Sequence, residues 1–239
     1  MAGLLLEGVH KSYGALKVTD GLGFALGPGE ALGVIGPNGA GKSTLFNLIT
    51  GVVRPDAGRI VFGGRDVTRC SATQRARLRI CRSYQVPQPF TQMTVFENLL
   101  VGASFAAGMK ERAARDHCAR VLEQTGLLAK ADLPAGSLRL LDRKRLELAR
   151  ALATRPRLLL LDEIAGGLTD DECQELLRLI RSIHAEGVAI IWIEHVVHVL
   201  LSFAQRLMVL NFGARLADGP AAQVMADAEV QRVYMGVEP

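Results

Sequence analysis

A glycine-rich segment at residues 36–44, GPNGAGKST, has the residue types and spacing that bind phosphate. It fits the pattern G-x-x-x-x-G-K-[ST] and lies between an apolar run typical of a strand and one typical of a helix. Glycines let the backbone wrap closely around anionic oxygens, and the N-terminus of the following helix adds a partial positive charge. A chance glycine-rich turn is the alternative, but the flanking runs favour a nucleotide-binding loop.

Each position of this loop has an expected task. Lys42 would neutralise the β- and γ-phosphates of ATP, and the hydroxyl of Ser43 would hold Mg²⁺. The other positions would mainly supply backbone N–H groups that point toward the phosphates. The expected contacts with ATP are Gly36, Pro37, Asn38, Gly39, Ala40, Gly41, Lys42, Ser43 and Thr44.

Two carboxylates follow the apolar run at residues 158–161, namely Asp162 and Glu163. Ligands of α/β proteins bind at the carboxyl ends of the strands, which is where this run would deliver both side chains. We expect Asp162 to orient the Mg²⁺ shell and Glu163 to activate or position the attacking water. Taken alone, the pattern is equally typical of a buried strand that meets a helix cap. The phosphate loop is what makes the catalytic interpretation strong.

Short apolar runs alternate with helical patterns along the chain, which predicts an α/β fold with a largely parallel sheet. The runs that begin at Ala31, Leu158, Val188 and Arg206 are the best candidates for buried central strands. The predicted strands are Leu4–Val9, Ala31–Ile35, Arg59–Phe62, Ile80–Gln85, Leu158–Asp162, Val188–Ile193 and Arg206–Leu210.

Residues 89–155 have a different character, because they are rich in alanine and charge and carry helical patterns. A capping box at 94–97, TVFE, opens the first of these helices, and a second box at 169–172, TDDE, opens a later one. We interpret 89–155 as a helical subdomain inserted into an α/β core of residues 1–88 and 156–239. The whole chain would then form a single domain.

Composition narrows the class of protein further. The formal net charge of +4 is too small and too dispersed to indicate nucleic-acid binding. The four cysteines include no C-x-x-C pair and no zinc spacing, so we expect reduced thiols. The N-terminal residues lack the features of a signal peptide, and no apolar run approaches the ~20 residues of a membrane-spanning helix. Any association with a membrane would be peripheral or through a partner.

Together, these motifs resemble the ATP-binding domains of ABC transporters over nearly the whole chain. The resemblance implies a P-loop NTPase core of the RecA-like type with a mostly parallel sheet, an N-terminal antiparallel β part and an inserted α-helical subdomain. It also implies ATP hydrolysis that requires Mg²⁺. A soluble ABC ATPase of DNA repair or translation would show a coiled-coil insertion or a second cassette, and a GTPase would show an Asn-Lys-x-Asp motif. The sequence shows none of these three features.

The resemblance assigns roles to three further residues. Tyr13, in KSYG, matches the aromatic residue that stacks on adenine. Gln85, in RSYQ, matches the glutamine that senses the γ-phosphate and Mg²⁺ and relays that state to the membrane subunits, although Gln88 and Gln92 lie close by. His195, in WIEH, matches the switch histidine that contacts the γ-phosphate. Tyr13 would therefore bind ATP, whereas Gln85 and His195 would act in catalysis. Gln85 would also lie near the metal.

A closer resemblance is to the ATPases of branched-chain amino acid uptake systems. The supporting segments include TQMTVFENLLVGA, KRLELARALATRPRLLLLDE and the terminal VYMG, and the more specific ones are NLITG and VLNFG. Related systems import urea, amides or aromatic acids, so the solute is weakly fixed. The resemblance implies integral membrane permease subunits, a second ATPase subunit and, indirectly, a solute-binding protein. It places the chain on the cytoplasmic face of the inner membrane.

One segment departs from the family pattern. The usual signature, Leu-Ser-x-Gly-Gln, is replaced by LRLLD at residues 138–142. Leu141 adds bulk where the backbone must approach the phosphate bound by the opposite subunit, and Asp142 could cap the helix although its charge opposes an anion. Arg139 could offset the lost donors with a bidentate phosphate contact. We therefore count Arg139 and Leu141 as candidate nucleotide contacts.

Two accounts of this departure compete, and a third is weaker. In the first, which we favour, the chain pairs with a different ATPase and only one composite site is impaired. In the second, the altered signature is functional through Arg139. In the third, the chain is mainly a regulatory nucleotide-binding subunit.

A groove around Gln85, Phe90, Met93 and Phe96 would dock a short helix of the membrane subunit. For any one of these residues, the alternative interpretation is that its side chain belongs to the core of the helical subdomain.

Overall fold

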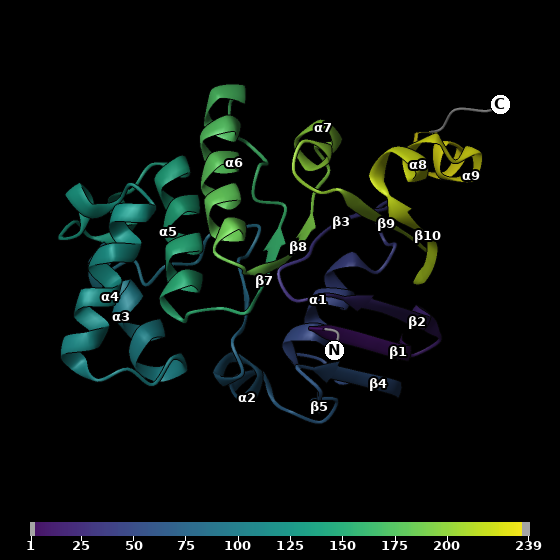
Figure 1. Ribbon diagram of the computed structural model, residues 1–239, viewed down its shortest axis with the longest axis horizontal. Coiled ribbons are helices and arrows are strands. Elements are labelled where there is room, and N and C mark those ends of the chain that lie inside the picture. Colours follow the sequence, from purple (N-terminus) through teal and green to yellow (C-terminus); the bar gives the residue numbers. More distant parts are fainter. Residues whose placement is uncertain (1–2, 236–239) are drawn as a thin grey trace.

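The computed structural model describes residues 3–235, which form two sheets flanked by helices (Figure 1). The strands are β1 (Leu4–Tyr13), β2 (Leu16–Leu26), β3 (Ala31–Ile35), β4 (Ala57–Phe62), β5 (Arg65–Asp66), β6 (Ile80–Arg82), β7 (Leu158–Asp162), β8 (Ala189–Ile193), β9 (Arg206–Asn211) and β10 (Ala214–Pro220). The α-helices are α1 (Lys42–Thr50), α2 (Ala72–Arg77), α3 (Val95–Val101), α4 (Glu111–Gln124), α5 (Leu140–Ala153), α6 (Asp170–Ala185), α7 (Val197–Leu201), α8 (Ala221–Ala226) and α9 (Ala228–Val230).

The six-stranded sheet has the order β10-β9-β3-β8-β7-β6 and is parallel except for the β9–β10 hairpin. Its four central strands are the four runs that the sequence marked as buried. The limits predicted for β3 and β7 are confirmed to the residue, whereas β8 begins one residue later than predicted. The predicted strand Ile80–Gln85 is too long, because pairing with β7 ends at Arg82 and leaves Gln85 in a loop.

The antiparallel sheet has the order β2-β1-β4-β5, which confirms the N-terminal antiparallel β part. Three strands were not predicted, β2, β5 and β10, and all three lie at the edges of their sheets. β5 has only two residues, both exposed, and β2 and β10 contain glycines and many exposed residues, so none of the three has the apolar signal of a central strand.

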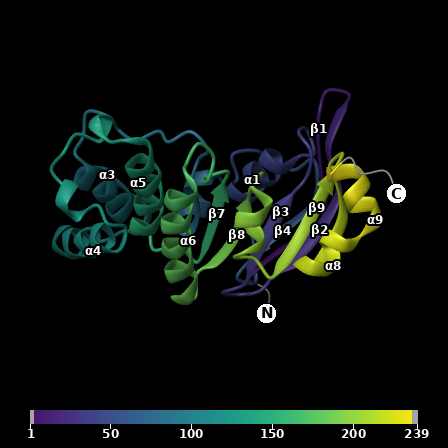
Figure 2. The same ribbon diagram turned by 90° about the horizontal axis from the view of Figure 1, so that it is seen from above.

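Both faces of the parallel sheet are covered, which explains its continuous apolar strands. Alternate residues point to opposite faces, as Leu159 and Leu161 of β7 show by packing with the helices α5 and α6, whereas Leu158 and Leu160 pack toward α1 and the antiparallel sheet. Figure 2 shows α6 beside β7 and β8, and the antiparallel strands on the other side of the sheet.

Helices α3, α4 and α5 gather at one end of the molecule, beyond β7, in both views (Figures 1 and 2). The two predicted capping boxes are confirmed, because the side chains of Thr94 and Thr169 accept hydrogen bonds from the backbone at the N3 positions of α3 and α6. No helix within residues 3–235 combines the length and apolarity needed to cross a lipid bilayer.

Candidate nucleotide site

The loop between β3 and α1 contains the phosphate-binding motif and holds its lysine in place. The ammonium group of Lys42 donates to the carbonyl oxygens of Gly36 (2.6 Å) and Pro37 (3.0 Å), and the side chain is buried. Burial lowers the pKa of Lys42, while the nearby charges of Glu163 and Asp162 oppose that shift. The positive charge therefore lies within the loop and in the field of both carboxylates.

Two glycines of the loop have left-handed backbones, with φ of 81° at Gly39 and 98° at Gly41. A Cβ at Gly41 would lie 2.6 Å from the carbonyl oxygen of Val18, whereas a Cβ at Gly39 would meet nothing within 4 Å. Gly41 is therefore required by its close packing against β2, whereas Gly39 is required only by its φ angle. The Ser43 side chain is exposed beside the loop and Thr44 is half-buried.

Asp162 and Glu163 stand at the carboxyl end of β7, and their surroundings differ. Asp162 is buried, and its Oδ2 accepts a hydrogen bond of 2.5 Å from Arg82 at the end of β6. Glu163 has a left-handed backbone with φ of 47°, and its N–H donates to the carbonyl of Ile193 on β8 (2.8 Å). A non-glycine residue in this conformation is strained, which is typical of functional positions.

Two of the three residues assigned by resemblance, Gln85 and His195, converge on Glu163. Its Oε1 lies 2.7 Å from Nε2 of His195, and its Oε2 accepts a hydrogen bond of 2.5 Å from Nε2 of Gln85. The three side chains come from the ends of β7 and β8 and from the loop after β6. The structure thus brings Gln85, Glu163 and His195 together.

The hairpin that carries Tyr13 packs beside the phosphate loop. Tyr13 is the last residue of β1, and its ring is half exposed with the Lys11 ammonium 5.5 Å from the ring centroid. Val18, on the next strand, touches Gly41, as the close approach of its carbonyl shows. The hairpin is thus placed near the nucleotide site.

Comparisons with known proteins agree with this geometry. The sequence profile of the ABC transporter family, described as "ABC transporter", matches residues 19–166. The chain belongs to the ABC transporter family. It is 35% identical to the high-affinity branched-chain amino acid transport ATP-binding protein BraF of Pseudomonas aeruginosa, and the match covers 98% of this chain and 97% of BraF.

Two other matches add to this assignment. The chain is also 35% identical to the lipopolysaccharide export system ATP-binding protein LptB of Acidithiobacillus ferridurans, with 98% and 96% of the two chains covered. A nucleotide-free ATP-binding cassette from an ABC transporter superposes with a TM-score of 0.91 at 31% identity, covering 99% of this chain and all of that one. The P-loop NTPase fold is thereby confirmed, and this ABC transporter subunit binds and hydrolyses ATP.

The altered signature of this ABC subunit lies at the start of α5. Arg139 is the N-cap residue and is exposed, but its side chain makes no capping hydrogen bond, and Leu141 is half-buried. The expectation that Asp142 caps the helix is wrong, because its buried side chain instead pairs with the Lys130 ammonium at 2.5 Å. The cavity of about 490 Å³ that Arg139 and Leu141 line includes no residue of the phosphate loop. The structure therefore does not bring this segment to the chain's own nucleotide site.

Sequence reasoning missed a buried charged residue, Glu194, that supports the site. Glu194 is buried, and burial raises its pKa although it accepts hydrogen bonds from the N–H groups of Ala165 (2.7 Å) and His195 (3.1 Å). Its carboxylate therefore ties the segment after Glu163 to the backbone of the histidine. The available signal was a glutamate directly after the apolar strand β8, in WIEH.

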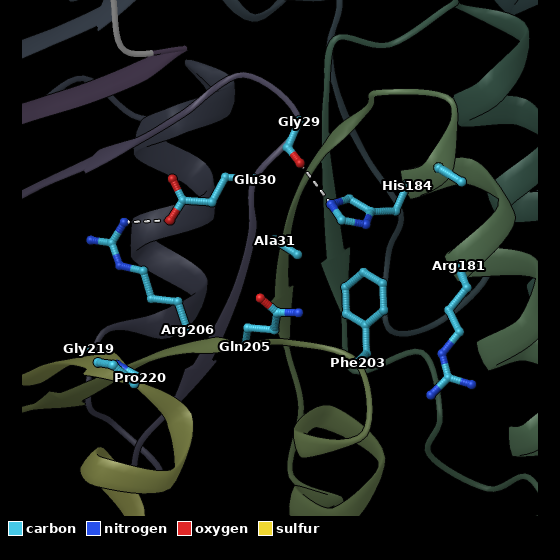
Figure 3. A pocket seen from close by; sticks show the side chains of 11 residues that line it. Gly29, Glu30, Ala31, Arg181, His184, Phe203, Gln205, Arg206, Gly219 and Pro220 are labelled. Carbon is cyan, nitrogen blue, oxygen red and sulfur yellow. Dashed lines mark hydrogen bonds and ion pairs between the residues drawn. The ribbon is translucent and has the colours of Figure 1, made fainter.

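A large cavity lies far from these groups. It measures about 860 Å³ and lies at the start of β3, whereas the phosphate loop follows the end of that strand. Figure 3 shows the side chains that line it. Its charged side chains are already bonded within the protein, since Arg206 pairs with Glu30 (2.8 Å) and the ring of His184 bonds the carbonyl oxygen of Gly29 (2.8 Å). Cavity size alone would therefore point to the wrong end of the sheet.

Of the segments behind the closer resemblance, VYMG at 233–236 ends at Gly236, which lies outside the described residues.

Proposed function

We propose that this ABC ATPase powers the uptake of branched-chain amino acids or related small solutes. BraF is named for high-affinity branched-chain amino acid transport and matches nearly the full chain. The observation that carries the catalytic part of the proposal is the convergence of Gln85 and His195 on Glu163, near the buried Lys42.

In the proposed reaction, catalysis is mainly positioning and charge stabilisation. Glu163 orients the attacking water, and His195 contacts the γ-phosphate. Gln85 reports the state of the phosphate to the loop that follows it. Gln85 and His195 each engage one carboxylate oxygen of Glu163, and each oxygen can accept a further hydrogen bond from a water.

The residues present fit a magnesium ion, which we propose accompanies ATP. Asp162 uses only Oδ2 for Arg82, and the Ser43 hydroxyl is exposed beside the loop, so hard oxygen donors are on hand. Residues 3–235 hold no cluster of three or more His, Cys, Asp or Glu side chains that could bind a metal unaided. Mg²⁺ is usually coordinated by one or two protein oxygens together with the phosphates of its nucleotide. When bound, the ion would neutralise charge on the β- and γ-phosphates.

We further propose that two ATPase subunits close around the nucleotides, so that each nucleotide binds one phosphate loop and the opposite signature. Closure would add contacts that neither open subunit can make, and hydrolysis would remove them. The altered signature at 138–142 would then act on the partner's nucleotide. This chain's own loop would face the partner's signature and hydrolyse ATP normally. A heterodimer with a second, different ATPase is the arrangement we favour.

Arg139 offers a direct test of that arrangement. Its exposed place at the N-terminus of α5 suits a phosphate contact, because helix N-termini attract anions. If the segment is catalytically idle, Arg139→Ala will leave phosphate release by the mixed dimer close to the wild-type rate. A loss as large as that of Glu163→Gln would show instead that the altered signature is functional.

The docking site we propose for the membrane permease lies beside Gln85. A cavity of about 430 Å³ is lined by Tyr84, Gln88 and Phe90, and the two aromatic rings are about half exposed. The sequence-based groove needs correction, because of its four residues only Phe90 lines this cavity, and Phe96 packs against the core. Gln85, Met93 and Phe96 are not among the lining residues. Exposed apolar side chains around a hollow suit a short helix of a permease. Such docking would hold the chain peripherally on the cytoplasmic face of the inner membrane.

A transport assay in proteoliposomes tests the proposal. The chain is combined with its permeases, the second ATPase and the solute-binding protein, and leucine uptake and phosphate release are measured together. We expect leucine with its binding protein to stimulate phosphate release, and Glu163→Gln to abolish both. Uptake of another small solute would correct the substrate. ATP binding without hydrolysis in any combination would support the regulatory alternative, and outward transport of a lipid would favour the activity for which LptB is named.

A further inference from the structure

Arg82 has an unusual setting for an arginine, because its guanidinium is buried beside a functional carboxylate. It is the last residue of β6, and its side chain is only 9% exposed. One terminal nitrogen donates to Oδ2 of Asp162 at 2.5 Å, and the other donates to Oδ1 of Asn47 at 2.7 Å. The guanidinium thereby connects the end of β7 with helix α1, which begins at the phosphate loop.

Aromatic rings fix the same group from two other directions. The centre of the guanidinium lies 5.3 Å from the ring centroid of Phe46, on α1, and 5.0 Å from that of Tyr84. The remaining Nε is buried and has no hydrogen-bond partner. A buried donor without a partner is unfavourable, so the position of this arginine is set by its two oxygen acceptors and two rings rather than by full satisfaction of its own donors.

We propose that Arg82 is a positioning residue that orients the Asp162 carboxylate for the magnesium ion of ATP. This inference rests on the magnesium site proposed above. Arg82 engages Oδ2 alone, so the other carboxylate oxygen is left to face the ion's shell. A guanidinium fixed by Asn47 and two rings is also unsuited to act as a displaceable plug that merely occupies the metal position.

The same residue can relate the metal to the transport machinery. Tyr84, which packs on Arg82, directly precedes Gln85 and lines the cavity that we assign to the permease. Groups that orient metal ligands commonly change metal affinity about 10- to 100-fold when removed. Arg82 therefore offers a test of metal positioning that is separate from nucleotide binding.

The test uses Mn²⁺ as a spectroscopic probe of the metal site and ADP as a nucleotide that is not hydrolysed. Electron paramagnetic resonance measures Mn²⁺ affinity in the ADP complex of the wild type, Arg82→Gln and Arg82→Lys. Calorimetry measures ADP affinity in EDTA. We expect Arg82→Gln to weaken Mn²⁺ binding at least tenfold while ADP affinity in EDTA changes less than about threefold. Arg82→Lys keeps the positive charge but loses the planar pair of N–H donors of the guanidinium. Its Mn²⁺ affinity should therefore lie between those of the wild type and Arg82→Gln.

The matched control is Arg157→Gln. Arg157 directly precedes β7, at the opposite end of the strand that carries Asp162, and its guanidinium also lies over an aromatic ring, that of Phe62 at 5.4 Å. Unchanged or tighter Mn²⁺ binding in Arg82→Gln would overturn the proposal, as would an equal loss of metal-free ADP affinity, which would indicate general damage. Failure of the wild type to bind ADP at all would instead refute the proposed function.

Discussion

The close approach of Gly41 to β2 gives a prediction about the phosphate loop that can be worked out from the structure. Gly41→Ala would place a Cβ 2.6 Å from the carbonyl oxygen of Val18, at a residue whose φ is 98°. The left-handed backbone costs an alanine about 1–2 kcal/mol, and relieving the overlap by moving main chain adds about 1–3 kcal/mol. We expect a total loss of unfolding free energy of about 3.5 kcal/mol, or roughly 10 °C in Tm for a domain of this size.

Gly39→Ala is the matched control, because it changes the same loop without an overlap. Its φ of 81° imposes a similar strain, but a Cβ there would meet nothing within 4 Å. We expect a loss of about 1.5 kcal/mol, or roughly 5 °C. The measurement is thermal unfolding without nucleotide, followed by circular dichroism. Equal destabilisation by both variants would refute the reasoning that packing against Val18 is what demands glycine at position 41.

The same overlap should also be visible in nucleotide binding. Moving the chain at Gly41 displaces the N-terminus of α1, whose first residue is Lys42. Losing one hydrogen bond to a charged phosphate is worth about 1.5–3 kcal/mol, so we expect ADP affinity to fall at least tenfold in Gly41→Ala. A calorimetric titration with unchanged affinity would show that the loop tolerates the displacement.

Three further predictions concern catalysis, pH and packing. Glu163→Gln should lower phosphate release about 10²- to 10⁴-fold while ATP binding by calorimetry is retained, and a rate near wild type would remove Glu163 from the reaction. Burial raises the pKa of Glu194, so the folded protein binds this proton more tightly than the unfolded chain and its stability rises as pH falls toward that raised pKa. Urea unfolding between about pH 8 and about pH 5 should show this gain in the wild type and not in Glu194→Gln, so identical pH slopes would contradict the assignment. Leu160→Ala, in the buried centre of β7, should lower the free energy of unfolding by about 2–5 kcal/mol, whereas the exposed Leu16→Ala should change it by less than about 0.5 kcal/mol.

The parts of the fold that the sequence predicted are those with strong local signals. A strand buried on both faces is an apolar run, so β3 and β7 were located to the residue. A capping box needs only four consecutive residues, so the starts of α3 and α6 were located as well. The edge strands β2 and β10 carry neither signal, because one side of each makes no ladder and many of their residues face solvent.

The parts that could not be predicted depend on contacts between distant segments. Asp142 has the residue type of a helix cap and lies in the first turn of α5, yet its carboxylate pairs with Lys130. Whether an aspartate caps a helix or binds a lysine is decided by where the neighbouring segment packs, and a local pattern does not contain that information. The pairing of Arg82 with Asp162 joins residues 80 positions apart, so only the folded sheet reveals it.

Helix α5 shows why the altered signature need not silence this subunit's own site. Lys144 donates to the carbonyl oxygen of Ile164 (2.7 Å), in the segment after Glu163, and Glu147 accepts a hydrogen bond from the N–H of Gln88 (3.1 Å), in the segment after Gln85. One face of α5 therefore contacts the segments that follow two of the proposed catalytic residues, while its N-terminus presents the variant sequence to a separate cavity. Changes confined to that N-terminus leave these buried contacts in place. The altered signature at the N-terminus of α5 is thus compatible with an intact arrangement of Glu163 and Gln85, whose following segments contact residues farther along the same helix.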